Sequence, residues 1–324
     1  MILLSEQTEN KQERRESVRL DETVKLLFEV SKELLVKTLN SLFHENYDVD
    51  RVEIEKTATE YPTNDLSILR ADIFIKITEH KPYHFHIEIE TEPSHEIAVR
   101  VFEYDIMKAI SNWRLDGKTT SEPEIFMPKS IVIHIEGGSR VPQEHHRVKL
   151  IMADGNIVNY TVPVMRYWEY DKSRLIQENL YTLLPLQVFM LRDELDRMTA
   201  RGDEEARQAA ILKARDIATN IINEIINIYK GGKISFYDVD KIMLAVKELF
   251  THLNKRYSVN EKLNTEVDIM VRTLYDENVV NQAKIEIAKK LLEKGLSVED
   301  IADSTELDPD IIEELKEQFE KNKR

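Results

Sequence analysis

Three acidic residues on two neighbouring segments are the side chains of this chain most suited to metal chemistry. Asp72 lies in the first segment, and Glu88 and Glu90 lie in the second. Mg²⁺ takes one or two carboxylates together with waters and phosphate oxygens, and Mn²⁺ accepts the same donors. Such an ion polarises a phosphate and activates a water molecule. The three carboxylates suit hydrolysis of a phosphodiester with Mg²⁺ or Mn²⁺ as cofactor. Acidic residues on the solvent face of a half-exposed hairpin are also ordinary, so the spacing alone leaves a purely structural role open.

Both segments alternate polar and apolar side chains, which predicts strands at residues 67–78 and 83–92 with a turn between them. Side chains of one parity belong to the core, so we expect the acidic set on an open side of the sheet. A turn centred on His80 would place Asp72 opposite Glu88 and Arg70 opposite Glu90. Opposed like charges destabilise a sheet, and a bound cation is the simplest compensation.

Positively charged partners for this cluster are candidates for catalysis or substrate binding. Lys76 shares the face of Asp72, although four residues of strand separate them by roughly 13 Å. Arg100 and Tyr104 lie four residues apart on a predicted helix at residues 94–113, and so face the same way. They could contact a phosphate or orient the acidic residues. Alternatively, Arg100 only pairs with a neighbouring glutamate of its own helix, Glu96 or Glu103.

Other polar residues could be metal ligands, but each also has a purely structural explanation. His84 and His86 share the acidic face and could be metal ligands, but exposed histidines at strand edges are common. The pair at residues 145 and 146 is expected in a loop. Glu22 could reach the metal from the first predicted helix, although acidic residues near a helix N-terminus also favour the helix dipole.

Periodicity predicts the elements that position these residues. A helix from Asp21 to about residue 44 comes first, then a strand at residues 49–60 and the two strands above. The predicted helix at residues 94–113 and a buried strand at residues 131–135 follow. Two more strands are predicted at residues 147–152 and 157–167. This order predicts an α/β core with a mixed sheet that extends to about residue 170.

The second half of the chain is predicted to be helical. Helices are expected at residues 186–199, 203–229, 235–256, 260–275 and 278–294, with a clear break at Gly231 and Gly232. Residues 288–315 resemble a helix-turn-helix, but the helix that would enter the major groove is acidic. We therefore interpret them as a packing or oligomerisation element. Three parts follow: an N-terminal arm at residues 1–20, a core at 21–170 and a helical region at 171–324.

Composition limits the function classes. The chain has 324 residues and no cysteine, which excludes thiolate metal sites and cysteine nucleophiles. It shows neither a signal peptide nor a membrane-spanning segment, so we expect a cytoplasmic protein. A formal net charge of -15 counts against a passive coat on nucleic acid but not against an enzyme with a local basic rim.

The order of motifs resembles the recombination-promoting nuclease (Rpn) family, also described as PD-(D/E)xK nuclease family transposases. That family opens with an Asp-headed helix similar to residues 21–28, followed by an Asp on a strand, here Asp72. An acidic residue followed two positions later by Gln or Lys comes next, at the positions of Glu88 and Glu90 here. An Arg and a Tyr one turn apart follow, here Arg100 and Tyr104. A Leu-Leu-Pro stretch at residues 183–185 and the segment at 290–302 also resemble the family.

The resemblance implies a restriction-endonuclease-like fold and a Mg²⁺-dependent DNA endonuclease linked to recombination or mobile DNA. Asp72, Glu88 and Glu90 would be the metal ligands, with Lys76 as a fourth catalytic residue. Arg70, Arg100 and Tyr104 would bind the substrate. A dimer through the helical region is expected, since cutting both strands of DNA needs two centres.

One position departs from the family pattern. Glu90 stands where the family has Gln or Lys, and it adds negative charge. It could be an extra metal ligand, or a lysine could come from elsewhere in the chain. The alternative function is a catalytically weakened protein of nuclease fold that serves as a protein-binding adaptor.

Overall fold

The structure is a computed structural model of the chain. It describes residues 23–56, 60–62, 68–70, 73–90, 94, 96–116, 122–138, 140–257 and 261–322.

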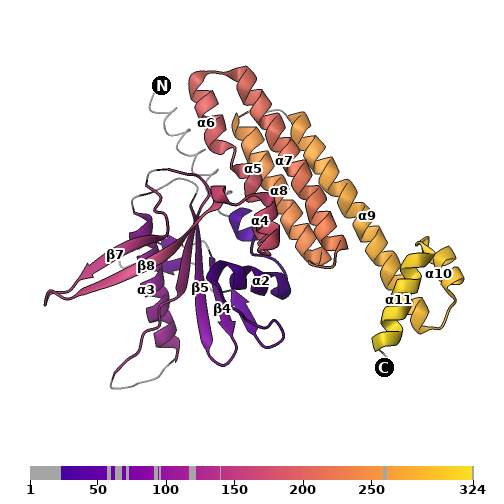
Figure 1. The fold of residues 1–324 in the computed structure, drawn as a ribbon, viewed down its shortest axis with the longest axis horizontal. Coiled ribbons are helices and arrows are strands. Elements are labelled where there is room, and N and C mark those ends of the chain that lie inside the picture. Colours follow the sequence, from indigo (N-terminus) through magenta and orange to yellow (C-terminus); the bar gives the residue numbers. More distant parts are fainter. Residues whose placement is uncertain are drawn as a thin grey trace. The chain divides into compact units, whose positions relative to one another are not determined.

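A six-stranded mixed sheet forms the centre of the α/β part (Figure 1). Its strands are β1 (Glu53–Lys56), β4 (Ile73–Thr78), β5 (Pro82–Glu90), β6 (Lys129–His134), β7 (His145–Ile151) and β8 (Ile157–Arg166). Across the sheet they follow the order β1-β4-β5-β6-β8-β7. β5 and β6 are parallel, as are β6 and β8, whereas the other neighbouring pairs are antiparallel. The predicted mixed sheet is therefore present.

Helices α2 (Lys32–Phe43) and α3 (Ile97–Asp116) cover opposite faces of this sheet. The ring of Phe43 in α2 lies 4.8 Å from the ring of Phe85 in β5. The next residue of β5, His86, hydrogen-bonds Asp105 in α3. Consecutive strand residues point to opposite faces, so each helix covers one of them. Helix α3 is also the crossover that the parallel pair of β5 and β6 requires.

The first predicted helix is interrupted, which corrects the expectation of one helix to residue 44. Residues 23–26 are helical, but α2 begins only at Lys32. The hydroxyl of Ser31 accepts a hydrogen bond from the Leu34 N–H at 3.2 Å and so caps a new helix. The Ser31 N–H in turn donates to Asp238 at 2.6 Å. A partner from the helical region therefore fixes where this helix starts.

Two of the predicted strands are also interrupted. Short strands β2 (Glu60–Pro62) and β3 (Ile68–Arg70) pair with each other in a separate two-stranded sheet. Arg70 has Glu60 as its cross-strand partner on one side. The described pairing of β4 with β5 ends at Ile73 and Ile87, so the predicted pairing of Arg70 with Glu90 stays a prediction. A two-residue period says which face a side chain takes but not which neighbour its strand pairs with.

Where β4 pairs with β5, the predicted register is confirmed. Phe74 lies opposite His86, and Thr78 lies opposite Pro82, as a turn centred on His80 requires. The hairpin of β7 and β8 is confirmed as well, with Gly155 at a φ of 86° in its turn. The strand β7 begins at His145, so His145 and His146 lie in a strand and not in the expected loop.

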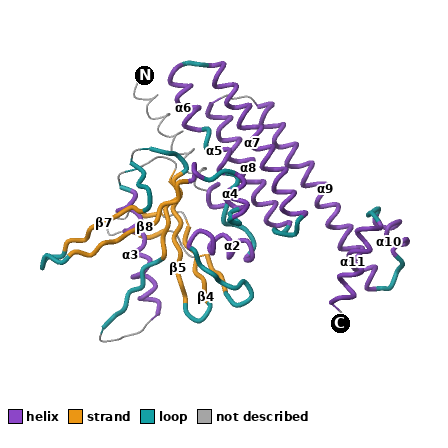
Figure 2. Tube along the Cα trace, in the orientation of Figure 1, coloured by secondary structure: helices purple, strands orange, loops and turns teal. Residues whose placement is uncertain are grey.

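The chain is helical from α4 onward, as expected (Figure 2). Short 3₁₀ segments lie at Tyr167–Glu169 and Tyr181–Leu183. The helices are α4 (Lys172–Gln177), α5 (Leu186–Phe189), α6 (Arg192–Arg201), α7 (Glu204–Lys230), α8 (Phe236–Tyr257), α9 (Glu261–Glu293), α10 (Val298–Thr305) and α11 (Pro309–Asn322). The break at Gly231 and Gly232 is confirmed. The two helices predicted at 260–275 and 278–294 are one helix, α9, because neither glycine nor proline interrupts it.

The chain divides into two compact units, Met1–Asn264 and Thr265–Arg324. The first contains the sheet and the helices up to α8. The second contains a buried cluster that joins the end of α9 to α10 and α11, with Ala288, Ile301, Leu307 and Ile312 at its centre. The helix-turn-helix-like segment therefore packs its apolar residues inside its own unit, as interpreted. The predicted boundary at residue 170 instead coincides with the change from strands to helices.

Candidate functional site

The polar face of β5 is covered by helix α3, so the expectation of an open side of the sheet is wrong. His86 and Glu88 are 0% and 3% exposed, as deeply buried as the apolar residues between them. The side chains of Arg100, Tyr104 and Asp105 extend from α3 onto this face. A buried polar group needs a hydrogen-bond partner, and each of these residues supplies or shares one.

Glu88 and Glu90 converge on one positive charge. The Nη2 atom of Arg100 lies 2.9 Å from Oε1 of Glu88 and 2.5 Å from Oε2 of Glu90. The Nε atom of Arg100 also donates to Oε1 of Glu88 at 3.2 Å. Arg100 thus pairs across the sheet face and not with Glu96 or Glu103. Of its two proposed roles, orienting the acidic residues is the one that this geometry supports.

The second oxygen of Glu88 faces His86. Nε2 of His86 lies 3.3 Å from Oε2 of Glu88, and Nδ1 of the same ring lies 2.7 Å from Oδ1 of Asp105. Burial alone would lower the pKa of His86, but the hydrogen bonds to Asp105 and Glu88 outweigh it and raise the pKa to about 9. The ring is therefore a cation at neutral pH, between two carboxylates.

Asp105 joins this group to two further strands. Its Oδ2 atom accepts hydrogen bonds from the hydroxyl groups of Ser130 in β6 and Tyr160 in β8. Burial and the neighbouring Asp105 carboxylate raise the pKa of Tyr160, which keeps its hydroxyl a donor. Asp105 itself is fully buried. The polar network therefore extends from β8 through α3 to the end of β5.

We name this set of seven residues the β5 network: His86, Glu88, Glu90, Arg100, Asp105, Ser130 and Tyr160. Three carboxylates in it face two cations, the guanidinium of Arg100 and the imidazolium of His86. Burial lowers the pKa of Arg100, but Glu88 and Glu90 more than offset this and raise it. One negative charge of the cluster remains uncompensated inside the network, which favours the approach of a further cation.

The predicted catalytic lysine lies apart from Glu88 and Glu90. Lys76 is paired opposite His84, and its ammonium binds Glu55 at 2.9 Å. A different lysine, Lys108 of α3, is buried on the same face, with its ammonium 5.6 Å from the centre of the Phe74 ring. Burial lowers the pKa of Lys108, which weakens its hold on its proton. The helix therefore adds a second lysine to the face that carries Lys76.

Tyr104 is buried, which places it in the wall of the site. Its ring meets the His86 ring edge to face, with centres 5.8 Å apart, and it packs against Phe74. The Phe74 ring is stacked on His86 with centres 4.3 Å apart. Tyr104 therefore holds the imidazole from the helix side, while Phe74 holds it from β4.

Three of the predicted site residues cannot be placed. Asp72 and Glu22 lie outside the described residues, and of Arg70 only the backbone is described. The prediction that Asp72 lies opposite Glu88 therefore stays a prediction.

A histidine pair lies on the same sheet face, next to Glu90. His134 of β6 is the strand partner of Glu90, and its Nε2 atom lies 2.8 Å from Nε2 of His146 in β7. Burial first, and then the nearby His146, lower the pKa of His134 to about 4. Both rings are thus neutral at pH 7, and one donates its N–H to the other.

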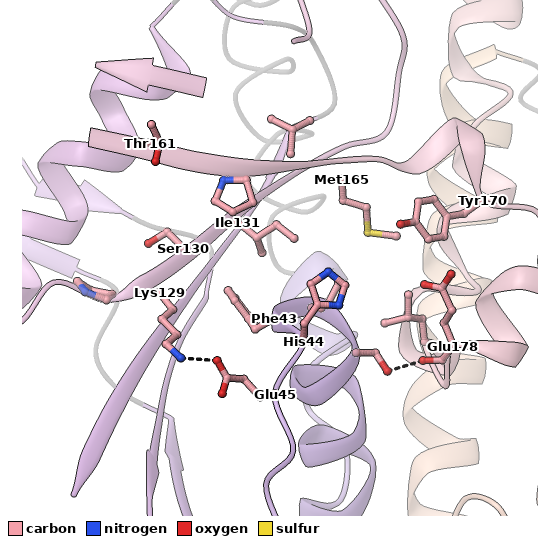
Figure 3. Close-up of a pocket in the computed structure, with 16 residues that line it drawn as sticks. Phe43, His44, Glu45, Lys129, Ser130, Ile131, Thr161, Met165, Tyr170 and Glu178 are labelled. Atoms are coloured by element: carbon pink, nitrogen blue, oxygen red, sulfur yellow. Dashed lines mark hydrogen bonds and ion pairs between the residues drawn. The ribbon is translucent and has the colours of Figure 1, made fainter. Parts of the chain in front are cut away.

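A cavity of about 470 Å³ lies on the other side of the sheet (Figure 3). Its walls include Ile131 and Met165, which point away from the β5 network, and the ion pair of Lys129 with Glu45. The end of α2 and the segment around Tyr170 close it further. None of the predicted site residues lines this cavity.

Sequence reasoning missed four members of the network or its surroundings: His86 as a bridge, and Asp105, Ser130 and Tyr160 as its anchors. One signal was available for the helix. Asp105 and Lys108 interrupt a row of apolar residues, at positions that share one helical face with Val101 and Tyr104. Polar residues in an otherwise apolar row indicate a buried polar contact. Nothing local points to Ser130 or Tyr160, since they meet Asp105 only through the fold.

The donor chemistry of Glu88 and Glu90 fits Mg²⁺ or Mn²⁺. Both ions bind carboxylate oxygens, and both carboxylates already approach a single positively charged atom. Among the described residues no group of three or more His, Asp or Glu side chains is arranged to hold a metal. A complete site would thus need a further ligand, which Asp72 is predicted to supply, and would need Arg100 to leave its present position.

Comparison with models of known protein families, with curated proteins and with solved structures returned no match. In the part of the chain that the structure describes, no helix is both long enough and apolar enough to span a membrane.

Proposed function

We propose that this chain is a Mg²⁺-dependent DNA endonuclease with a restriction-endonuclease-like core. The observation that carries the proposal is the convergence of Glu88 and Glu90 on one cationic nitrogen of Arg100 at the end of β5. Acidic residues one apart on a strand are ordinary on a solvated surface. Here Glu88 is buried and Glu90 is nearly buried, and an oxygen of each carboxylate contacts the same nitrogen of Arg100.

The order of elements supports the proposed core. Helix α2, the antiparallel strands β1, β4 and β5, the crossover helix α3 and the parallel strand β6 follow one another in the sheet region. This is the succession of helix, three strands, helix and strand that the sequence pattern predicts for an α/β core. In such a core the acidic residues lie on the two central antiparallel strands, where Asp72 and Glu88 are predicted to face each other.

The chain's own residues have distinct tasks in this proposal. Glu88 and Glu90 hold the metal, with Asp72 as the predicted third ligand. Arg100, once released from the two glutamates, binds a phosphate oxygen of the DNA. When bound, the metal supplies Lewis-acid polarisation of the phosphodiester and a water of lowered pKa. Lys108 is the cation available on the same face to stabilise developing negative charge.

The test is cleavage of supercoiled plasmid DNA by the purified full chain with Mg²⁺. We expect nicked and linear products with the wild-type protein, and loss of at least about a hundredfold in rate for Asp72→Ala and Glu88→Gln, since each removes a ligand of the metal. Glu53→Gln on the exposed edge strand is a matched control that should cleave normally. Equal cleavage by all four proteins would reject the assignment.

One observation favours a second candidate, a catalytically weakened protein of nuclease fold that binds other proteins. Arg100 already pairs with both Glu88 and Glu90, so each carboxylate has a cationic partner without any metal. Calorimetry with Mg²⁺ or Mn²⁺ separates the candidates. Saturable binding that Glu88→Ala abolishes supports the nuclease, whereas no heat of binding at millimolar metal supports the adaptor.

Cleavage of both DNA strands by one centre per chain would require two copies. We therefore propose that the active form is a dimer. Sedimentation of the protein on a short DNA duplex, with Ca²⁺ in place of Mg²⁺ to prevent cleavage, would give the mass of two chains per duplex. One chain per duplex would contradict the dimer.

A further inference from the structure

We propose that His86 and Asp105 are positioning residues that hold Glu88 so that one of its oxygens stays directed at the cation position. The inference rests on the proposed function only for the identity of that cation. The positioning itself follows from the contacts of the β5 network.

The two oxygens of Glu88 have different partners. Oε2 faces Nε2 of His86, and Oε1 faces Nε and Nη2 of Arg100. A carboxylate held at one oxygen can rotate about its last bond only by giving up that contact. His86 therefore fixes the direction of Oε1, whether the cation there is Arg100 or a metal ion.

His86 is itself immobilised on every side that the structure describes. Asp105 binds its Nδ1 atom at 2.7 Å, Phe74 stacks on one side of the ring, and Tyr104 meets it edge to face. The side chain is fully buried. Moving the ring would take one hydrogen bond from each of two buried carboxylates, Asp105 and Glu88, which costs far more than a comparable change at the surface.

Asp105 is fixed by elements other than its own helix. Ser130 in β6 and Tyr160 in β8 both donate to its Oδ2 atom, and its Oδ1 atom binds His86. Three strands and one helix thus determine where the imidazole lies. The chain of contacts runs from Asp105 through His86 to Oε2 of Glu88, and Oε1 of Glu88 is directed at Arg100.

Residues that orient a metal ligand in this way typically change metal affinity about 10- to 100-fold when they are removed. We expect His86→Phe, which keeps an aromatic ring but has no nitrogen, to weaken Mn²⁺ binding by that factor. His86→Gln retains a donor that can reach Glu88 but loses the contact with Asp105. Its Mn²⁺ affinity should lie between those of wild type and His86→Phe.

His84 provides the matched control. It lies on the same strand and the same face, one pleat away from His86, and it is paired opposite Lys76. His84→Phe makes the same chemical change outside the β5 network. We expect its Mn²⁺ affinity to stay within about twofold of wild type, because the contacts of Glu88 with His86 and Arg100 are kept.

A coupling experiment tests the positioning without any metal. Unfolding in denaturant with EDTA is measured for Asp105→Asn, Glu88→Gln and the double variant. These residues are linked in the structure through His86, so we expect the effects on the unfolding constant to deviate from multiplicative by about fivefold or more. In a His86→Phe background the same effects should multiply to within about twofold.

The outcomes separate this inference from the proposed function. Independent effects of Asp105→Asn and Glu88→Gln in the wild-type background would overturn the positioning role, whatever the protein does with metal. Equal Mn²⁺ affinity for His86→Phe and wild type would also overturn it. Coupling through His86 in a wild-type protein that binds no Mn²⁺ would support the hold on Glu88 and would reject the nuclease instead.

In cleavage assays a positioning role predicts a specific pattern. His86→Phe should need about 10- to 100-fold more Mg²⁺ for half-maximal cleavage, while the KM for DNA stays unchanged. Excess Mg²⁺ should then restore most of the rate. A fall in rate that no Mg²⁺ concentration restores would show that His86 does not act through the ligand.

Discussion

The two faces of strand β5 are buried to the same degree but by different contacts. On the α2 side, Phe85 and Ile87 pack against apolar neighbours. On the α3 side, His86 and Glu88 take part in the network of charges and hydrogen bonds. Apolar packing tolerates small changes in shape, whereas a buried charge needs each partner in place. A protein gains little net stability from such a network, which supports our proposal that the residues around Glu88 and Glu90 have a functional role.

The largest effect on stability is expected on the polar face. Glu88→Ala leaves both Arg100 and His86 with a missing partner, and we expect a loss of about 4 kcal/mol in the free energy of unfolding. Denaturant titration at pH 7 in EDTA measures it. A loss below about 1 kcal/mol would mean that Glu88 contributes no essential contact to the network.

A substitution on the apolar face of β5 should lower the free energy of unfolding slightly less, and the loss should not depend on pH. Ile87→Ala creates a cavity between the sheet and α2 and should cost about 3 kcal/mol. Because no charge is involved, the loss should be the same at pH 5 and pH 8. A marked pH dependence of this loss, followed by denaturant titration, would show that the two faces of β5 are not independent.

Removal of the cation is expected to have an intermediate effect. Arg100→Ala removes the cation shared by Glu88 and Glu90, while His86 still pairs with Glu88. Partial exposure of Arg100 limits the loss to about 2 kcal/mol. Mn²⁺ should restore much of this stability, and it should bind the variant more tightly than wild type. Weaker Mn²⁺ binding by Arg100→Ala in calorimetry would contradict the view that Arg100 and the metal compete for one position.

The histidine pair beside Glu90 predicts a loss of stability in acid. The pKa of His134 is lowered from 6.5 to about 4 in the folded protein. As the pH falls below 6.5, His134 is protonated in the unfolded chain but stays neutral in the folded protein. The free energy of unfolding therefore falls by about 2 kcal/mol by pH 5. His134→Gln should remove this part of the pH dependence. An unchanged difference between pH 7 and pH 5 in the variant would refute it.

The smallest effect is expected at the lysine that sequence pattern singled out. Lys76 binds Glu55 on the edge strand and lies opposite His84. Lys76→Met should therefore change the cleavage rate by no more than about twofold, whereas Lys108→Met should reduce it at least tenfold if a lysine stabilises developing charge. A large loss for Lys76→Met alone would reverse this assignment.

The alternation and register of β4 and β5 could be predicted from sequence because both depend on local properties. A period of two fixes the face of each side chain, and the turn at His80 fixes which residues oppose each other. The same pattern predicted that Glu88 and Glu90 share a face with His86. These features place Glu88 and Glu90 correctly relative to each other and to His86.

The burial of the polar face of β5 by helix α3 could not be predicted, because it depends on contacts between residues far apart in the sequence. Asp105 meets Ser130 and Tyr160 only after β6 and β8 have joined the sheet. The start of α2 depends in the same way on Asp238, which lies 207 residues from Ser31. A polar pattern on a strand shows that a face differs from the core, but not whether water or a helix covers it.

The most direct test is a crystal structure of the full chain grown with Mn²⁺, in which anomalous scattering locates the ion. The account predicts a peak within roughly 2.5 Å of carboxylate oxygens of both Glu88 and Glu90, with the Arg100 guanidinium displaced and His86 still against Glu88. Arg100 bound to both glutamates at saturating Mn²⁺, with no anomalous peak beside them, would contradict it.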